Sequence, residues 1–171
     1  MDERGPATVG ATARPWAFEG LRRSVGGLQS LGWVDAHIVL GQALWWACLL
    51  DETCWPEPGY EKARAAHSSG RVLPGLRYAR NAMGHGAAPV RSLTTFSLDG
   101  DPLPYEWIPA RLLDMYSPPQ RPRSPRTTAD RAAYDDHVAG RPLEEPLQDA
   151  MRWFEHVDAI EWDFPHSAGT H

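Results

Sequence analysis

The sequence predicts a mainly α fold, a helical bundle of four or five helices with a small β-hairpin insertion. Apolar residues recur at spacings of three and four before residue 86 and again after residue 128, as on the buried face of a helix. Between these regions, residues 92–98 alternate and are rich in Thr and Phe, and residues 105–108 follow an Asp-Gly-Asp turn. This middle segment is typical of a short hairpin at about 92–108.

The length and composition fit one domain with a real core. The chain has 171 residues, of which 42% are hydrophobic, so wholesale disorder is excluded. We predict a single helical domain over residues 15–160. Residues 1–14 are rich in Gly, Ala and Thr and are expected to form a flexible N-terminal arm, and residues 161–171 a flexible tail.

Two long helices should open the domain. The first is expected from about Pro15 to Leu31, because proline suits a first helical turn and apolar residues follow at helical spacing. The second is expected from about Val34 to Cys54 and stops before Pro56. It is apolar nearly all round, which favours a central position in the bundle.

A loop and a third helix should follow. Residues 55–71 are expected to be a loop with a short helical turn around residues 60–66. The third helix should start at about Leu73 and end at Gly84 and Gly86, since glycine is common directly after a helix.

The rest of the chain is expected to be helical after the hairpin. A helical turn is expected at residues 112–116, followed by a Pro/Arg loop at residues 118–126. A last helical region should run from Thr128 to Ile160, in two pieces because Gly140-Arg141-Pro142 interrupts it.

The net charge and the two cysteines indicate which kinds of partner and which cellular compartment are expected. The formal net charge of −5 argues against a general nucleic-acid coat protein, although residues 115–129 contain arginines and no acid. Cys48 and Cys54 lie too far apart along one helix for a disulfide, which indicates reduced thiols in a reducing compartment.

Targeting signals are not predicted. The N-terminus has no apolar segment of the kind found in signal peptides, and the longest apolar stretch, residues 38–50, is too short to span a bilayer. We expect a soluble, cytoplasmic protein without a membrane partner.

The segment GLRYARNAMGHG, residues 75–86, gathers polar side chains near the predicted end of the third helix. Asn81 and His85 are four residues apart and share one helix face. Arg80 and His85 lie about 140° apart around the axis, but arginine is long and His85 sits at the helix end. All three side chains can therefore converge on one cleft edge.

These residue types suit phosphodiester chemistry. A histidine can move a proton to or from a ribose hydroxyl near neutral pH. A guanidinium can stabilise charge that builds on the phosphoryl oxygens, and an asparagine can orient either partner. No metal is needed if the RNA supplies its own 2′-hydroxyl as nucleophile, and the sequence predicts neither a metal site nor a cofactor.

The run from Arg80 to His85 resembles the R-x4-6-H motif of the HEPN superfamily, with the polar Asn81 directly after the arginine as that family prefers. HEPN domains are helical bundles, and many are metal-independent endoribonucleases of toxin–antitoxin, phage-defence and RNA-processing systems. They typically dimerise, so that two motifs face one cleft. The resemblance implies catalytic roles for Arg80, Asn81 and His85, a homodimer, an RNA substrate and an antitoxin or regulatory partner.

Acidic and basic residues outside this motif are expected to support catalysis by Arg80, Asn81 and His85. In some HEPN proteins an acidic residue of the preceding helix supports the site, and either Asp51 or Glu52 can take that part here, with Glu52 slightly favoured. Alternatively, Arg80 pairs with one of these acids only to join two helices, and His85 only caps a helix end. The candidate RNA contacts are Arg77, Arg121, Arg123 and Arg126.

Other common sites are not indicated. The remaining histidines form neither H-x3-H nor H-E-x-x-H, so a zinc site is disfavoured. The sequence has no G-x-G-x-x-G, P-loop or G-x-S-x-G pattern. The alternative function is a non-catalytic helical module that binds a nucleotide or a protein. An open site favours catalysis, whereas a buried, fully hydrogen-bonded one favours a structural role.

Overall fold

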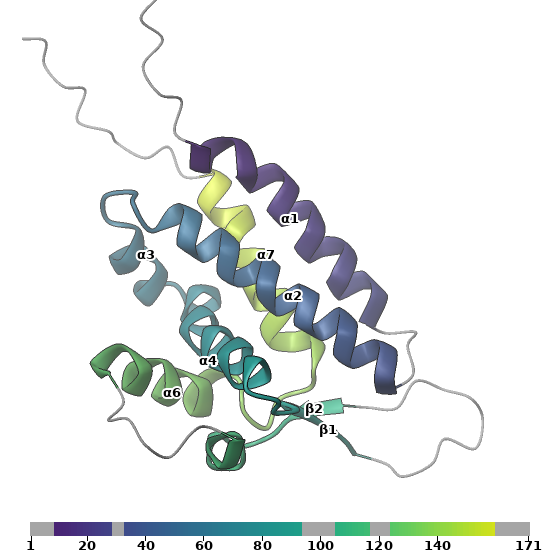
Figure 1. Ribbon diagram of the computed structural model, residues 1–171. Coiled ribbons are helices and arrows are strands. Elements are labelled where there is room, and N and C mark those ends of the chain that lie inside the picture. The colour runs from purple at the N-terminus through teal and green to yellow at the C-terminus, as the bar shows by residue number, and fades with distance from the viewer. Residues whose placement is uncertain (1–8, 29–32, 94–104, 117–123, 160–171) are drawn as a thin grey trace, which may run out of the picture.

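The computed structural model describes residues 9–28, 33–93, 105–116 and 124–159 (Figure 1). Its helices are α1 (Val9–Leu28), α2 (Trp33–Cys54), α3 (Tyr60–Ala66), α4 (Val72–Gly84), α5 (Ala110–Leu113), α6 (Pro125–His137) and α7 (Glu144–Ala159), with short 3-10 turns at Ser68–Arg71 and Asp114–Tyr116. The strands β1 (Val90–Ser92) and β2 (Tyr105–Trp107) form one antiparallel pair. The prediction of a mainly α fold with a small hairpin is confirmed, with five long helices and two short ones in the described residues.

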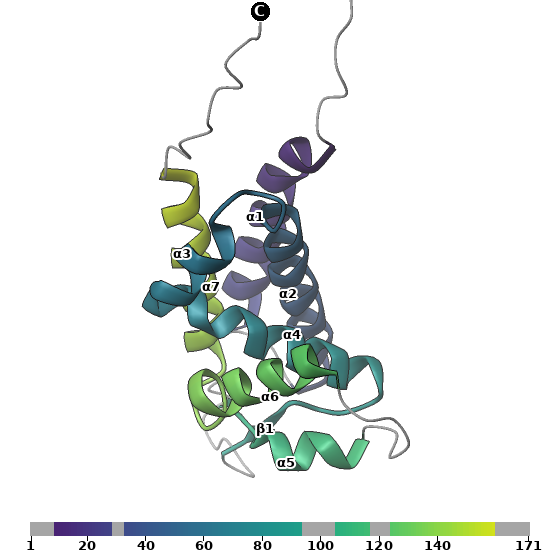
Figure 2. The ribbon, with the colours of Figure 1, turned by 90° about the vertical axis from the view of Figure 1, so that its left-hand side faces the viewer.

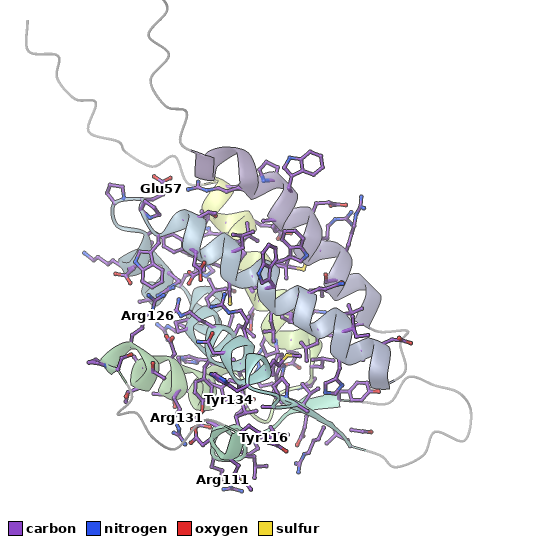
Figure 3. The ribbon with its side chains drawn as sticks, in the orientation of Figure 1. Glu57, Arg111, Tyr116, Arg126, Arg131 and Tyr134 are labelled. Atoms are coloured by element: carbon purple, nitrogen blue, oxygen red, sulfur yellow. The ribbon has the colours of Figure 1, made fainter. Side chains whose placement is uncertain are left out.

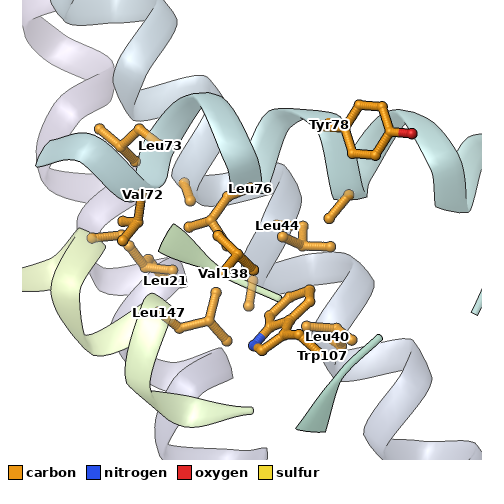
Figure 4. Packing of buried hydrophobic residues seen from close by; sticks show 14 of the residues in the cluster. Leu21, Leu40, Leu44, Val72, Leu73, Leu76, Tyr78, Trp107, Val138 and Leu147 are labelled. Atoms are coloured by element: carbon orange, nitrogen blue, oxygen red, sulfur yellow. The ribbon is translucent and has the colours of Figure 1, made fainter. Parts of the chain in front are cut away.

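The long helices enclose one hydrophobic core. α1 and α2 lie side by side, α7 packs against both, and α6 lies across α4 at one end of the molecule (Figures 1 and 2). Leu21 of α1, Leu44 of α2, Leu76 of α4 and Leu147 of α7 meet in the fully buried centre (Figure 4). Trp107 of β2 closes this core and donates its Nε1 hydrogen to the Leu143 carbonyl at 3.0 Å, which ties the hairpin to the bundle.

α1 begins at Val9, six residues before the predicted start, so residues 9–14 belong to the helix and not to the expected arm. Pro15 therefore lies inside the helix, where its missing N–H removes one hydrogen bond. Arg14, the residue before this proline, bonds the Thr53 carbonyl in the last turn of α2 at 3.1 Å and the Glu57 carboxylate beyond that helix at 2.6 Å. The predicted end at Leu31 falls outside the described residues.

α2 has nearly the predicted bounds and packs against three other helices, but one of its faces stays open. One stripe of the helix is open: Ile38 is 58% and Trp45 is 50% exposed, and Gln42 and Glu52 on the same side are exposed as well. α1, α4 and α7 cover the other sides. The helix is apolar nearly all round, yet the single chain leaves one of its faces exposed.

The close packing of α4 against α6 depends on a glycine. A Cβ at Gly75 would lie 2.8 Å from the Val138 side chain and 2.9 Å from the Tyr134 backbone. α4 ends as predicted at Gly84, and Gly86 adopts a positive φ of 88° just beyond it. His85 lies between these glycines as the C-terminal capping residue.

The segments around the hairpin differ in detail from their predictions. β1 is formed by Val90–Ser92, earlier than expected, with Val90 opposite Trp107, and residues 94–104 lie outside the described ones. A short helix, α5, precedes the 3-10 turn that replaces the predicted turn at 112–116. α6 begins at Pro125, three residues early, because the Ser124 hydroxyl caps it by accepting from the Thr127 N–H at 3.1 Å. The predicted break between the last two helices is confirmed by α6 and α7.

Both cysteines are buried free thiols, as predicted. Burial raises the pKa of Cys48 to about 12 and that of Cys54 to about 11, from an ordinary 9.0. Burial also raises the pKa values of Tyr60 and Tyr134.

These shifts predict that alkali destabilises the protein. Between about pH 9 and pH 11 the unfolded chain loses protons that the folded chain keeps, so the free energy of unfolding should fall as the pH rises. Calorimetric melting should show a lower Tm at about pH 10 than at about pH 8. Replacing Cys48 and Cys54 by alanine should reduce the difference, and an equal Tm at both pH values in the parent would contradict it.

Candidate functional site

The three predicted site residues share one cavity at the C-terminal end of α4. The cavity has a volume of about 580 Å³. It is lined by Trp45 of α2, by Tyr78, Arg80, Asn81, Ala82, Gly84 and His85 of α4 and its cap, and by Thr127 and Asp130 of α6. The last turns of α4 supply most of the wall, and α2 and α6 border it on either side.

Arg80 is held by two neighbours. Its Nη2 donates to Asn81 Oδ1 at 3.2 Å, and its Nη1 lies 3.5 Å from Glu52 Oε1. The arginine side chain is about one-third exposed, so its remaining N–H groups can still reach a ligand. Glu52 is thus the acid that contacts the cavity's arginine, a contact that fits both a supporting role and the alternative in which the pair only joins two helices.

The His85 side chain is neither buried nor hydrogen-bonded to the described residues, unlike that of a histidine that holds a fold together. The residue is exposed, and within the described part of the chain its imidazole makes no hydrogen bond. Its backbone N–H, not its side chain, bonds the carbonyls at the end of α4. Asn81 is also exposed. The imidazole is therefore accessible to a bound molecule.

Asp51, the other candidate acid, does not reach this cavity. It is 1% exposed and accepts hydrogen bonds from Tyr60 Oη at 2.8 Å, Arg64 Nη1 at 2.7 Å and Arg77 Nη1 at 2.9 Å. Asp51 belongs to a buried charge cluster, and the expectation that it supports Arg80 is not met.

The structure corrects the assignment of Arg77 as an RNA contact. Arg77 is 5% exposed. Its Nε and Nη2 donate to the two oxygens of Asp130 at 2.9 and 2.7 Å, and a third bond reaches Asp51. Burial alone lowers the pKa of Arg77, but the bonds and charge of Asp130 and Asp51 outweigh it and raise the pKa. Arg77 joins α2, α4 and α6 and has no face open to a phosphate.

The other arginines assigned to RNA lie elsewhere. Arg126 is exposed in the first turn of α6, with its guanidinium carbon 4.2 Å from the Trp55 ring centroid. It is near the α3–α6 side of the molecule in Figure 3 and does not line the cavity of His85. Arg121 and Arg123 fall outside the described residues.

Sequence reasoning missed several wall residues. Tyr78 precedes Asn81 by three positions, so helical spacing could have found it. Its hydroxyl donates to Asp114, whose other oxygen accepts from Arg131 Nε at 2.9 Å. Thr127 and Asp130 carried no comparable signal, because they reach the cavity only through the packing of α6 on α4.

None of the described helices combines the length and apolar composition that a bilayer crossing requires. In the same residues, no group of three or more His, Cys, Asp and Glu side chains is arranged to hold a metal ion. Comparisons with protein-family models, curated proteins and solved structures find no match to this chain.

Proposed function

We propose that this chain is a HEPN-like, metal-independent endoribonuclease with Arg80, Asn81 and His85 as its catalytic residues. One observation carries the proposal: an exposed imidazole without a structural hydrogen bond shares a cavity with a guanidinium and an amide. Such a set provides proton transfer and charge stabilisation in one place. The R-x4-6-H resemblance supports the same chemistry.

In the proposed reaction the 2′-hydroxyl of the RNA attacks the adjacent phosphate. His85 acts as general base or general acid, and Arg80 stabilises the charge on the phosphorane. Asn81 holds the phosphate or orients Arg80, and Glu52 restrains Arg80 from the other side. The phosphorus–oxygen bond to the 5′-leaving oxygen breaks, which leaves a 2′,3′-cyclic phosphate and a 5′-hydroxyl.

The experiment is cleavage of mixed RNA in the presence of EDTA. The parent protein should cut RNA and produce the two named ends, which phosphatase and kinase labelling distinguish. DNA of the same sequence should stay intact, because it lacks the internal nucleophile. A strict need for a divalent metal would overturn the mechanism.

We also propose that the protein acts as a homodimer in the cytoplasm. The open stripe of α2 with Ile38 and Trp45 adjoins the cavity, since Trp45 lines it. A second copy packed over this stripe would bring two cavities together. An interface of about 1,200 Å² or more in total is expected, and the two buried free thiols fit a reducing compartment.

The dimer makes a separate prediction. Light scattering should give twice the chain mass at micromolar concentration, and Ile38→Glu should shift the protein toward monomer because it places a charge in the interface. Arg152→Glu on the far helix α7 serves as the control. A monomeric parent protein would refute the dimer.

The alternative remains a non-catalytic module that binds nucleotides or proteins. The ion pair between Arg80 and Glu52 favours it, because it occupies part of the guanidinium without any substrate. RNA binding without cleavage would support this alternative. In a toxin–antitoxin or phage-defence system, the antitoxin or regulator would be the protein partner.

A further inference from the structure

A second hollow lies on a neighbouring face of the first turns of α6. It has a volume of about 380 Å³ and is lined by Trp55, Glu61, Arg64, Pro74, Arg77, Arg126, Ala129, Asp130 and Ala133. Asp130 lines both hollows, and the adjacent residues Arg126 and Thr127 face one hollow each. The two hollows therefore adjoin each other at Asp130.

Trp55 forms its aromatic wall. The guanidinium carbons of Arg64, Arg77 and Arg126 lie 5.4, 5.1 and 4.2 Å from the tryptophan ring centroid. These distances allow cation–π attraction. The indole is thus fixed in place at the edge of the hollow, and only part of it is accessible.

Arg126 differs from the two buried arginines. Arg64 pairs with Asp51, and Arg77 pairs with Asp51 and Asp130. Among the described residues Arg126 forms no ion pair, and it is exposed. The N–H donors of Arg126, which Figure 3 labels, are therefore the ones in this hollow that no carboxylate of the described residues occupies.

The lining favours a flat, partly polar ligand. Trp55, Pro74, Ala129 and Ala133 offer apolar surface, while Glu61 can accept hydrogen bonds and Arg126 can donate them. A nucleobase has an apolar face and an edge with both donors and acceptors. A lone phosphate fits less well, because the Glu61 carboxylate would repel it and only one arginine is uncompensated.

We propose that this Trp55–Arg126 hollow binds an unpaired base of the RNA strand whose phosphodiester lies at Arg80 and His85. The base stacks on the outer face of the Arg126 guanidinium, which itself lies over the Trp55 ring, and Glu61 accepts from the edge of the base. This inference rests on the proposed function. It predicts single-stranded RNA as the substrate, because bases in a duplex are paired and stacked on each other.

The test measures RNA binding by fluorescence anisotropy, with the His85→Ala protein as the background for every variant. A single abasic nucleotide moved along a mixed-sequence oligonucleotide should weaken binding at one position by about 5- to 100-fold, the usual contribution of one stacked base. In Trp55→Leu protein the abasic penalty should vanish, and Trp55→Phe should retain it. Arg126→Ala, an exposed change that leaves the fold intact, should reduce the penalty, and Arg152→Ala on α7 should not.

The outcomes separate this site from the nuclease proposal. An abasic penalty that depends on Trp55, without cleavage by the parent protein, supports the hollow and overturns the nuclease. Cleavage by the parent with an abasic penalty unchanged in both Trp55→Leu and Arg126→Ala overturns the hollow. A third outcome is that no abasic penalty is found, and that Arg126→Ala reduces the slope of log binding constant against log salt concentration by about one unit. This outcome would identify Arg126 as a phosphate contact and would also overturn the base site.

Discussion

Replacing His85 by alanine should reduce the rate of RNA cleavage by about 10²- to 10⁴-fold, the usual effect of losing a positioned acid–base group. The fold should not change, because the imidazole is exposed and makes no hydrogen bond within the described residues. Single-turnover cleavage and thermal melting of the same preparations measure the two quantities. His156→Ala, at an exposed histidine of α7 whose ring stacks on His67, is the control for the cleavage rate.

Arg80 refines this prediction. Arg80→Ala should also remove cleavage, whereas Arg80→Lys should restore only part of it, because lysine keeps the charge but not the planar donor arrangement. Glu52→Gln should have a smaller effect, since it loosens the arginine without removing it. A His85→Ala protein that cuts RNA as fast as the parent would contradict the assignment of His85.

Asp51→Ala should lower the free energy of unfolding by about 3–5 kcal/mol, the cost of breaking a buried ion pair from one side. The carboxylate is the shared partner of Arg64, Arg77 and Tyr60, and its side chain is 2% exposed. Its removal leaves Arg77 paired with Asp130 alone and leaves Arg64 without an ion-pair partner among the described residues. Urea unfolding followed by circular dichroism measures the change.

Glu19→Ala is the control for this second prediction. Glu19 also bonds two arginines, Arg22 at 2.8 Å and Arg23 at 2.6 Å, but these pairs lie on the surface of α1. Solvent screens such pairs, so little change in stability is expected. Similar losses for Glu19→Ala and Asp51→Ala would show that burial does not determine the strength of these contacts.

Helical spacing predicted much of the fold. The bounds of α2, α3 and α4 and the break before α7 follow from apolar periodicity and from the positions of proline and glycine. The start of α1 was not predicted, because the sequence does not reveal tertiary contacts such as that of Arg14 with Glu57, 43 residues away. The open stripe of α2 was missed because composition does not reveal how many neighbours a helix has.

The site was predicted only as far as it lies on one helix. Arg80, Asn81 and His85 share a cavity because they follow each other at the end of α4. Asp51 and Glu52 are adjacent, and about 100° of rotation around α2 separates a buried acid from an exposed one. Which of them faces α4 depends on packing, as does the burial of Arg77 against Asp130.

Gly75 affects both hollows through the distance between α4 and α6. Its missing methyl group lets the backbone of α6 approach α4, with 2.9 Å left between an added Cβ and Tyr134. The same helix, α6, forms a wall of both hollows. A larger side chain at position 75 would push α6 away from α4, and this one displacement would change the dimensions of both hollows together.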